Sequence, residues 1–524
     1  MKKLNFTSIA ICIFTFCFIL SMQVTATNYF VKTDGTGTGL SWDDALSFDN
    51  LITKLASDFE EGDVIYMTGG TYKPASSSVT MNIINGISII GGFDPSLSGT
   101  TVPEISYPSL TPTIISGDLN NDGIPNAGDA RLVTINSPEK VTLKGITFTN
   151  GYANSTATLR PGIQVLNGSQ CDILYCVITN NKSDITYHIN AGGAGLFTNK
   201  AIVYCYATVF TDNVVANRGA AIRVYDHTDR LVLERCQLSG NINTGDWSGA
   251  IMFGAAECKT FCINTTIANN SVGTGGGGLN GAGWLYLISS TVANNTCTKN
   301  LTVGLDIRME STNKVFAYNS IITNSDETNP SIFINGTAYN FTSNGNNVFG
   351  KVGGTGTLIS QSTDSLNKQY SAVFGSNVLA NNTGYPQTIA LKENITGSTL
   401  TKIQNYTDSV INNIFTTSDL ALDGRGTARP TIEPVSVGAF QYTGVTTTNE
   451  TKQMEAFVVY PTIVTNNFNV LGAEGAKISL FDINGKTYKQ INCAENIESI
   501  DVTNFPKGLY VVLVNNIAKR IIKQ

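Results

Sequence analysis

A repeat of about 29 residues runs through the middle of the chain and restricts the folds open to it. Seven short segments share one pattern, in which apolar residues precede a small polar residue and usually an asparagine. Their apolar anchors are Phe148, Ile178, Phe210, Leu238, Ile267, Val292 and Ile322. Successive anchors are 30, 32, 28, 29, 25 and 30 residues apart. Strand-forming residues at this period predict a solenoid of stacked β-coils.

Each repeat contains three short predicted strands. Two apolar positions before each anchor are two residues apart, so they face the same side of a strand. One column is Val141, Cys171, Val203, Leu231, Thr260, Leu285 and Val315, and the other is Leu143, Ile173, Cys205, Leu233, Cys262, Leu287 and Ala317. A third strand in each period begins near a glycine, as in Gly162–Val165 and Gly249–Phe253. The sequence therefore predicts an all-β parallel β-helix over residues 27–445.

The asparagine that ends most repeats predicts a sharp corner. Asparagine tolerates the left-handed backbone of such corners, and stacked side-chain amides can bond from coil to coil. The plain alternative is that asparagine is merely common in this chain. Cysteines in these columns lie too far apart for disulfides, since Cys205 and Cys262 are two coils, or about 9.5 Å, apart. We expect them to be small buried hydrophobic residues.

Composition excludes several classes of protein. Hydrophobic residues make up 42% and charged residues only 14%, which argues against a disordered chain. The net charge of -6 gives no basic excess to neutralise phosphates, so we expect no nucleic-acid partner.

The first 26 residues have the pattern of a secretory signal peptide. Lys2 and Lys3 precede an apolar run from Ile9 to Leu20, and Val24-Thr25-Ala26 supplies small residues for cleavage. The run is shorter than the roughly 20 residues that span a bilayer, and no later stretch is apolar enough. We expect an extracellular protein, or one at the outer cell surface, with no transmembrane segment in the mature chain.

Two segments flanking the repeats resemble a known family. Tyr29-Phe30-Val31-Lys32, Gly37–Ala45, Gly62–Tyr66 and Gly70–Pro74 resemble the opening of secreted bacterial β-helix proteins with pectate-lyase-like or polymorphic outer-membrane-type repeats. Leu422–Gly426 and Val437–Tyr442 resemble the close of surface β-helix modules that carry variable anchors. The resemblance implies a right-handed parallel β-helix whose first coil is capped by a short helix between Leu46 and Phe59.

A polar linker, residues 446–453, precedes a predicted small β-sandwich over residues 454–524. Its expected strands are Phe457–Tyr460, Phe468–Leu471, Lys477–Asp482, Thr487–Ile491, Ile497–Val502, Gly508–Val514 and Ala518–Ile522. Tyr460-Pro461, Ile478–Lys486 and Gly508–Val512 resemble the C-terminal sorting domain of the type IX secretion system of Bacteroidetes. Thr462-Ile463 stands where that family usually has Asn-Pro. The resemblance implies export by that machinery and surface attachment; a purely structural sandwich is the alternative.

One loop matches the spacing of a calcium site. Oxygen ligands at positions 1, 3, 5, 7, 9 and 12 with glycine at position 6 are typical of EF-hand and dockerin loops. The ligands would be Asp118, Asn120, Asp122, the Ile124 carbonyl, Asn126 and Asp129. Position 12 is not glutamate and a strand follows, so an Asx-rich corner is the alternative. We expect at most a structural Ca²⁺ ion and no other cofactor.

Candidate catalytic residues gather in one stretch of sequence. Arg218, Arg223, Asp226 and Arg230 would be the site of a polysaccharide lyase or glycoside hydrolase that acts on an acidic polysaccharide. The complete motifs of pectate lyases and polygalacturonases are absent, and solvated surface charge is the alternative.

An outward-facing column offers a different function. It includes Tyr204, Phe261, Tyr286 and Phe316, whose rings would stack on sugars or lie beneath another segment. The leading hypothesis is therefore a non-catalytic adhesin or glycan-contacting protein that binds a polysaccharide or a host or matrix ligand. The lyase or hydrolase is its rival.

Overall fold

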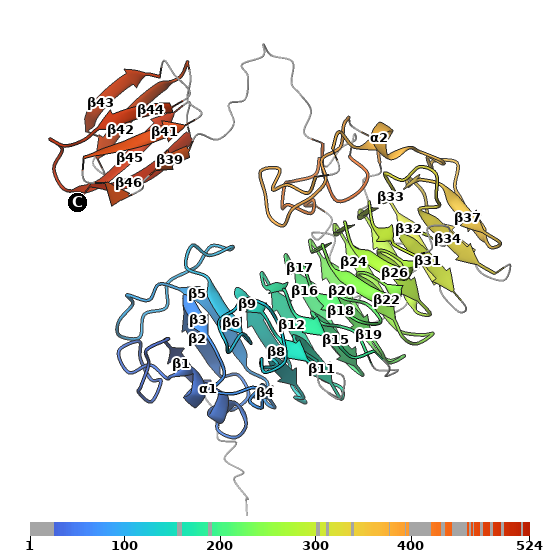
Figure 1. Ribbon diagram of the computed structural model, residues 1–524, viewed down its shortest axis with the longest axis horizontal. Helices are drawn as coiled ribbons and strands as arrows, with labels where there is room; N and C mark the ends of the chain where they lie inside the picture. Colours follow the sequence, from blue (N-terminus) through green and yellow to red (C-terminus); the bar gives the residue numbers. More distant parts are fainter. Residues whose placement is uncertain are drawn as a thin grey trace, which may run out of the picture. The chain divides into compact units, whose positions relative to one another are not determined.

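A computed structural model provides the structure of the protein, and its larger unit is a parallel β-solenoid (Figure 1). The chain divides into two compact units, residues 1–443 and 444–524. The described residues are 26–154, 160–186, 191–299, 304–310, 314–336, 340–376, 378–393, 395–397, 421–430, 435–442, 458–460, 463–464, 466–471, 475–482, 486–493, 497–514 and 517–523. The predicted signal peptide up to residue 25, the linker and His188 lie outside them.

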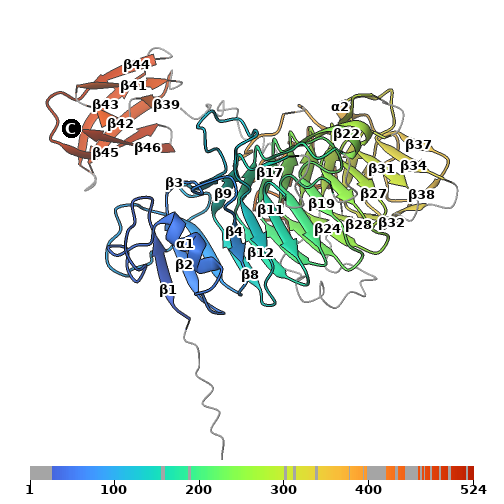
Figure 2. The same ribbon diagram turned by 60° about the horizontal axis from the view of Figure 1, so that its bottom comes forward.

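Three long parallel sheets run along the solenoid, and strands of successive coils lie side by side (Figure 2). Sheet A contains β1 (Asn28–Val31), β2 (Val64–Thr68), β5 (Ser88–Phe93), β8 (Val141–Lys144), β12 (Gln170–Leu174), β16 (Ile202–Tyr206), β20 (Arg230–Glu234), β24 (Lys259–Ile263), β28 (Trp284–Ile288), β32 (Lys314–Tyr318), β35 (Asn340–Ser343) and β38 (Thr357–Ile359). Sheet B contains β3 (Gly70–Tyr72), β6 (Thr113–Ser116), β9 (Ile146–Thr149), β13 (Val177–Thr179), β17 (Val209–Thr211), β21 (Gln237–Ser239), β25 (Thr266–Ala268), β29 (Thr291–Ala293), β33 (Ile321–Thr323) and β36 (Val348–Phe349). Sheet C contains β4 (Met81–Ile83), β7 (Val133–Ile135), β11 (Ile163–Leu166), β15 (Leu196–Asn199), β19 (Ile222–Val224), β23 (Ile251–Phe253), β27 (Leu279–Gly281), β31 (Ile307–Glu310), β34 (Ile332–Asn335) and β37 (Val352–Gly354). The predicted fold class, with three strands per turn, is confirmed.

The middle coils add a fourth sheet that the sequence did not reveal. Sheet D contains β10 (Tyr152–Ala153), β14 (Lys182–Ser183), β18 (Val214–Val215), β22 (Ile242–Ser248), β26 (Ser271–Gly276) and β30 (Thr296–Cys297). Most of these strands are too short to show a pattern of alternating side chains. They lie between sheets B and C, directly after the asparagine corner.

The two predicted apolar columns form the core in the predicted register. On sheet A, Cys171 pairs with Val203 and Ile173 with Cys205, and the same offsets hold in the next coils. Each residue of both columns is buried. Burial of an aliphatic side chain contributes about 1.5–3 kcal/mol, so these two columns supply much of the stability of the solenoid. At one end, α1 (Phe48–Leu55) buries Phe48, Leu51 and Leu55 in the same core.

The predicted left-handed corners are present, but the continuous amide ladder is one residue further along. Asn150, Asn180, Asp212, Asn269 and Asn294 have φ between 51° and 59°. The residue after the corner is a fully buried asparagine in five successive coils: Asn181, Asn213, Asn241, Asn270 and Asn295. Each Nδ2 donates to Oδ1 of the next coil at 2.8–3.0 Å. Buried amides need such partners, so the ladder fixes the spacing of the coils.

A buried carboxylate ends this ladder. Asn295 donates to Asp306 Oδ1 through both its backbone N–H, at 3.0 Å, and Nδ2, at 2.9 Å. Asn324 Nδ2 donates to Asp306 Oδ2 at 3.1 Å. All amide groups of the ladder point the same way, so its last member needs a group that accepts, and both Asp306 oxygens do so. Asp306 therefore lies inside the wall, fully buried.

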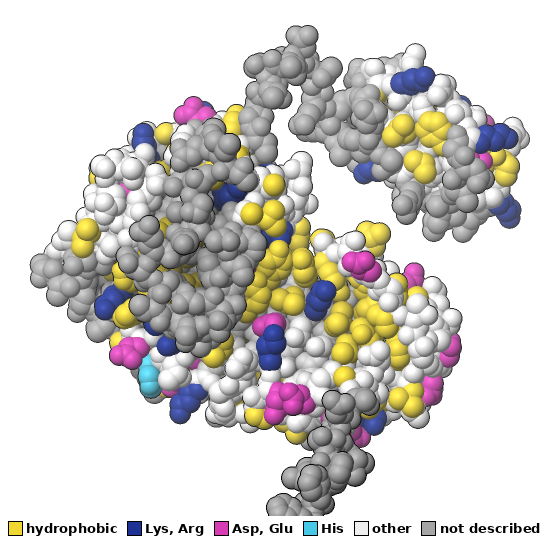
Figure 3. Space-filling view, turned by 180° about the vertical axis from the view of Figure 1, so that it is seen from behind, with side chains coloured by type: hydrophobic (Ala, Val, Ile, Leu, Met, Phe, Trp, Pro, Cys, Tyr) yellow, Lys and Arg dark blue, Asp and Glu magenta, His cyan; other side chains and the backbone are white. Residues whose placement is uncertain are grey.

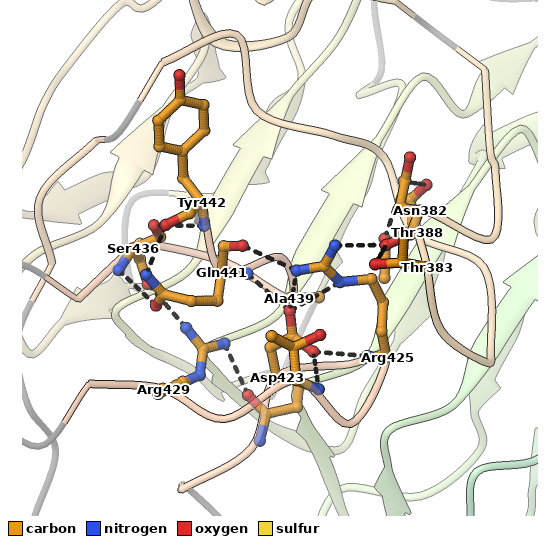
Figure 4. Close-up of polar contacts among 12 residues, drawn as sticks. Asn382, Thr383, Thr388, Asp423, Arg425, Arg429, Ser436, Ala439, Gln441 and Tyr442 are labelled. Atoms are coloured by element: carbon orange, nitrogen blue, oxygen red, sulfur yellow. Dashed lines mark hydrogen bonds and ion pairs between the residues drawn. The ribbon is translucent and has the colours of Figure 1, made fainter. Parts of the chain in front are cut away.

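The segment after the last coil covers sheet B. Tyr370 and Val373 of α2 (Tyr370–Val373) pack with Ile321 and Val348, and later residues of the segment join the same cluster. A buried polar network fixes this segment (Figure 4). Asp423 accepts hydrogen bonds from Arg425 Nε at 2.9 Å and Nη2 at 2.6 Å, while Arg429 donates to Asn264 Oδ1 at 2.9 Å on the solenoid.

The C-terminal unit contains two small, mainly antiparallel sheets. One comprises β39 (Val458–Tyr460), β41 (Asn467–Leu471) and β44 (Ile497–Asp501), and the other β40 (Ile463–Val464), β42 (Lys477–Asp482), β43 (Thr487–Asn492), β45 (Gly508–Val514) and β46 (Ile517–Lys523). Its core includes Phe468, Ile478, Leu480 and Val512. The predicted strands agree within one residue, and only β40 was missed. The predicted turn at Asn484-Gly485 lies outside the described residues.

Asp306 predicts a pH dependence of stability. Burial raises the pKa of Asp306 to about 8, above its usual value of 3.8. The folded state then holds a proton that the unfolded state has lost, so this contribution is complete below pH 4 and is lost as pH rises through 8. We expect the free energy of unfolding, from urea titrations between pH 5 and 9, to fall with pH. In Asp306→Asn this component should vanish, and an unchanged pH profile would contradict the assignment.

The Asp423–Arg425 pair should be essential to the larger unit. Asp423→Leu leaves a buried guanidinium without its carboxylate, so we expect a loss of about 3–5 kcal/mol in the free energy of unfolding. Denaturant titration of the chain from residue 27 measures it. The exposed Lys54–Asp58 pair, at 3.0 Å, is the matched control, and Asp58→Asn should give no measurable change.

Candidate functional site

The structure separates the four predicted catalytic residues into two places. Arg218 and Arg223 line a groove of about 170 Å³ on the outer side of sheet C. Asp226 lies instead on the turn that leads from β19 to β20, and Arg230 is the first residue of β20. There Asp226 accepts from Thr228 N and Oγ1 at 2.9 Å, and Arg230 Nη1 donates to the Asp229 carbonyl at 2.9 Å. Closeness in sequence therefore did not make these residues one site.

The groove crosses four neighbouring strands of sheet C. Besides the two arginines, its lining is Trp247, Met252, Phe253, Gly254, Gly281, Ala282 and Glu310. The outward residues of these strands are aligned, with Arg223 paired to Met252, Met252 to Asn280 and Asn280 to Arg308. Adjacent coils are about 4.8 Å apart, so the groove extends about 14 Å from β19 to β31.

Two bulky residues stand at a corner where neighbouring coils have glycine. Arg218 has φ 69° and Trp247 has φ 90°, in the left-handed region that L-residues avoid. In the coils on either side, Gly192 and Gly275 occupy the corner with φ 97° and 134°. A left-handed backbone costs a non-glycine residue about 1–3 kcal/mol, and such strain gathers at functional sites. This strain makes the Arg218–Trp247 pair a candidate binding element.

Neighbouring groups hold the strained pair in place. Asn280 Nδ2 donates to the Trp247 carbonyl at 2.7 Å. A Cβ at Gly275 would lie 2.1 Å from the same carbonyl oxygen, so glycine is required there. The Arg218 guanidinium lies 5.5 Å from the centre of the Trp247 ring, within range of a cation–π interaction.

The groove is positively charged at the end formed by the arginines. Burial lowers the pKa of Arg223 to about 9, which is still above neutral pH, and burial also lowers the pKa of Arg218. Arg223 is only 1% exposed and supplies charge from beneath the surface, whereas Arg218 and Trp247 are partly exposed. The positive charge of Arg160 also contributes to lowering the pKa of Arg223. A cationic surface beside an indole ring suits a ligand with a carboxylate or sulfate and an apolar face.

The opposite end of the groove is electrically balanced. Glu310 lines it and forms an ion pair with Arg308 Nη2, with side chains 23% and 18% exposed. Neither Trp247 nor Glu310 was predicted from the sequence as a site residue. No local sequence pattern marks the left-handed position of Trp247. Glu310 belongs to a strand three coils after β19 and reaches the groove only because the coils stack in register.

The predicted glycan-binding row is in register but differs from a sugar platform. Phe261 and Tyr286 stack at 4.5 Å, and Tyr286 and Phe316 at 5.0 Å, with interplanar angles of 11° and 16°. Faces stacked on each other leave ring edges toward the surface. Phe261 is fully buried, while Tyr204, Tyr286 and Phe316 are partly buried. The rings therefore pack mainly against one another along sheet A.

One face of the larger unit carries scattered charges. Figure 3 shows Lys, Arg, Asp and Glu side chains scattered among hydrophobic and uncharged polar ones. A second hollow, of about 280 Å³, contains Asp326, Glu327, Lys351 and Lys368 and no aromatic residue.

The thiols of Cys176, Cys236 and Cys258 are buried, and burial raises the pKa of each to about 12. They are therefore poor nucleophiles.

The predicted calcium loop folds as a set of side-chain-to-backbone turns. Asp118 accepts from Asp122 N and Gly123 N at 3.2 Å, and Asp129 accepts from Leu119 N at 3.1 Å. Asn120 and Asn126 donate to Asp122 Oδ2 at 2.9 and 2.7 Å. Lys73 Nζ lies 3.6 Å from Asp118 Oδ2, and the Ile124 side chain is exposed. Among the described residues, no three His, Cys, Asp or Glu side chains are grouped to hold a metal ion.

Similarity to known proteins identifies the second unit. Residues 458–524 match the family described as the secretion system C-terminal sorting domain. The C-terminal unit is a type IX sorting domain. The sorting domain implies that the protein is exported and that it interacts with the secretion machinery. In the described part of the chain, no helix is long and apolar enough to cross a membrane.

The remaining comparisons cover the chain as a whole. A comparison with curated proteins gave no match. Among solved structures, the crystal structure of pectate lyase Pel9A is similar, with a TM-score of 0.39 and 14% sequence identity. The match covers 80% of this chain and 97% of the other.

The calcium site remains a prediction with a direct test. If the loop binds Ca²⁺, adding Ca²⁺ to chelator-treated protein should raise the midpoint of thermal unfolding. Asp122→Asn should abolish that increase, because it removes a ligand charge. Asp326→Asn, in a turn of the second hollow, is the control. An unchanged midpoint on adding Ca²⁺ would leave the loop as a corner closed by Lys73.

Proposed function

We propose that this protein is an exported, non-catalytic β-solenoid that binds an acidic glycan in the groove of Arg218, Arg223 and Trp247. One observation carries the proposal: two bulky residues occupy left-handed positions that neighbouring coils give to glycine. A cation and an indole are held together at this cost in backbone strain. Their chemistry matches a sugar that bears a carboxylate or sulfate.

The lining of the groove supports binding rather than hydrolysis. A glycosidase requires two carboxyl groups at a defined separation. Among the described lining residues only Glu310 carries a carboxyl, and Arg308 is paired with it. The sorting domain supports presentation to extracellular polymers, including a host or matrix ligand.

A second candidate function is elimination by a polysaccharide lyase. It is favoured by Arg223, because burial lowers its pKa toward the range in which a base can take a proton. Its 1% exposure restricts access of a substrate, so we place binding first.

Arg218→Gly is the sharpest variant for testing the proposal. We expect it to weaken retention on acidic polysaccharides at least about tenfold, because the cation is lost. Its melting temperature should stay the same or rise, because glycine adopts φ 69° without strain. Affinity electrophoresis of the chain from residue 27 against acidic and neutral polysaccharides measures the effect.

The matched control is Lys200→Gly, which removes an exposed cation from another left-handed position, with φ 56°. It should bind normally. Retention of all acidic polymers by Arg218→Gly would contradict the proposal. Formation of unsaturated products that absorb in the ultraviolet, abolished by Arg223→Lys, would establish the lyase instead.

A further inference from the structure

The two ends of the groove differ in charge, and this difference bears on which acidic glycans fit. Arg218 and Arg223 lie on the coil of β19, whereas Glu310 lies on β31, three coils away. At about 4.8 Å per coil, the two ends are about 14 Å apart, longer than one sugar residue. Different sugar units of one chain would therefore contact the two ends.

Glu310 determines the charge of the distant end. It faces the groove and is partnered by Arg308 Nη2, so the pair together adds no net charge. The residues between the two ends are uncharged, namely Met252, Phe253, Gly254, Gly281 and Ala282. A second carboxylate on the ligand would meet there only the Arg308 guanidinium, which Glu310 already neutralises, and it would approach the Glu310 carboxylate. Like charges at an interface are strongly unfavourable.

We propose that Glu310 makes the groove selective for glycans with an isolated acidic residue followed by neutral sugars, against polymers charged at every residue. The inference rests on the proposed glycan binding. The acidic group lies at Arg218 and Arg223, the adjacent ring contacts Trp247, and uncharged units extend toward Glu310. Glu310 acts as a specificity-determining residue by repelling the wrong ligand.

The test compares three soluble oligosaccharides of equal length: one with a single uronate, one with a uronate at every position, and one that is neutral. Titration calorimetry measures each dissociation constant with the chain from residue 27. The protein should bind the singly charged chain best. Glu310→Gln frees Arg308, so affinity for the fully charged chain should rise about tenfold, and less so at high salt, while the singly charged chain changes little.

Glu104→Gln is the matched control, because it removes one exposed carboxylate from a loop outside the groove. It should leave the order of affinities unchanged. If the protein binds no acidic chain at all, the proposed function fails. If it binds both acidic chains equally and Glu310→Gln changes neither, the proposed function stands and the role of Glu310 is overturned. Circular dichroism checks that both variants are folded.

Discussion

Every feature of the solenoid depends on the hydrogen bonds that stack one coil on the next at a fixed spacing. Backbone pairing sets the register of the sheets, and the asparagine ladder enforces it at the corner between sheets B and D. A buried amide without a partner costs about 1–3 kcal/mol, so a coil that slips out of register loses several such bonds together. Asp306 ends the chain of amides by accepting from Asn295.

The same constraint creates the candidate site. A corner must turn within one or two residues, and the turn requires a left-handed backbone that glycine adopts most easily. Gly192 and Gly275 follow this rule, whereas Arg218 and Trp247 depart from it in the two coils between them. Stacking then brings a guanidinium and an indole from successive coils within 5.5 Å. The proposed binding site thus lies where local conformation is least favourable.

The outer surfaces of sheets A, B and C differ in what packs against them. The C-terminal segment covers sheet B with an apolar cluster and fixes itself through Asp423, Arg425 and Arg429. On sheet A the aromatic side chains of successive coils stack on one another, so their ring faces are in contact. Sheet C retains a groove that combines charge with an accessible aromatic ring. This leaves sheet C as the surface best suited to a polar ligand.

The sequence by itself determined the solenoid, the two core columns, the left-handed corners and the sorting domain. Their signals are local or strictly periodic, as in the match of Cys171 with Val203. Only the tertiary structure decided which side chains meet outside the core. Asp226 and Arg230 follow Arg223 in sequence but leave its strand at the next turn, whereas Trp247 and Glu310 reach the groove from later coils. Residues around one coil point in different directions, and residues one repeat apart lie about 4.8 Å from each other.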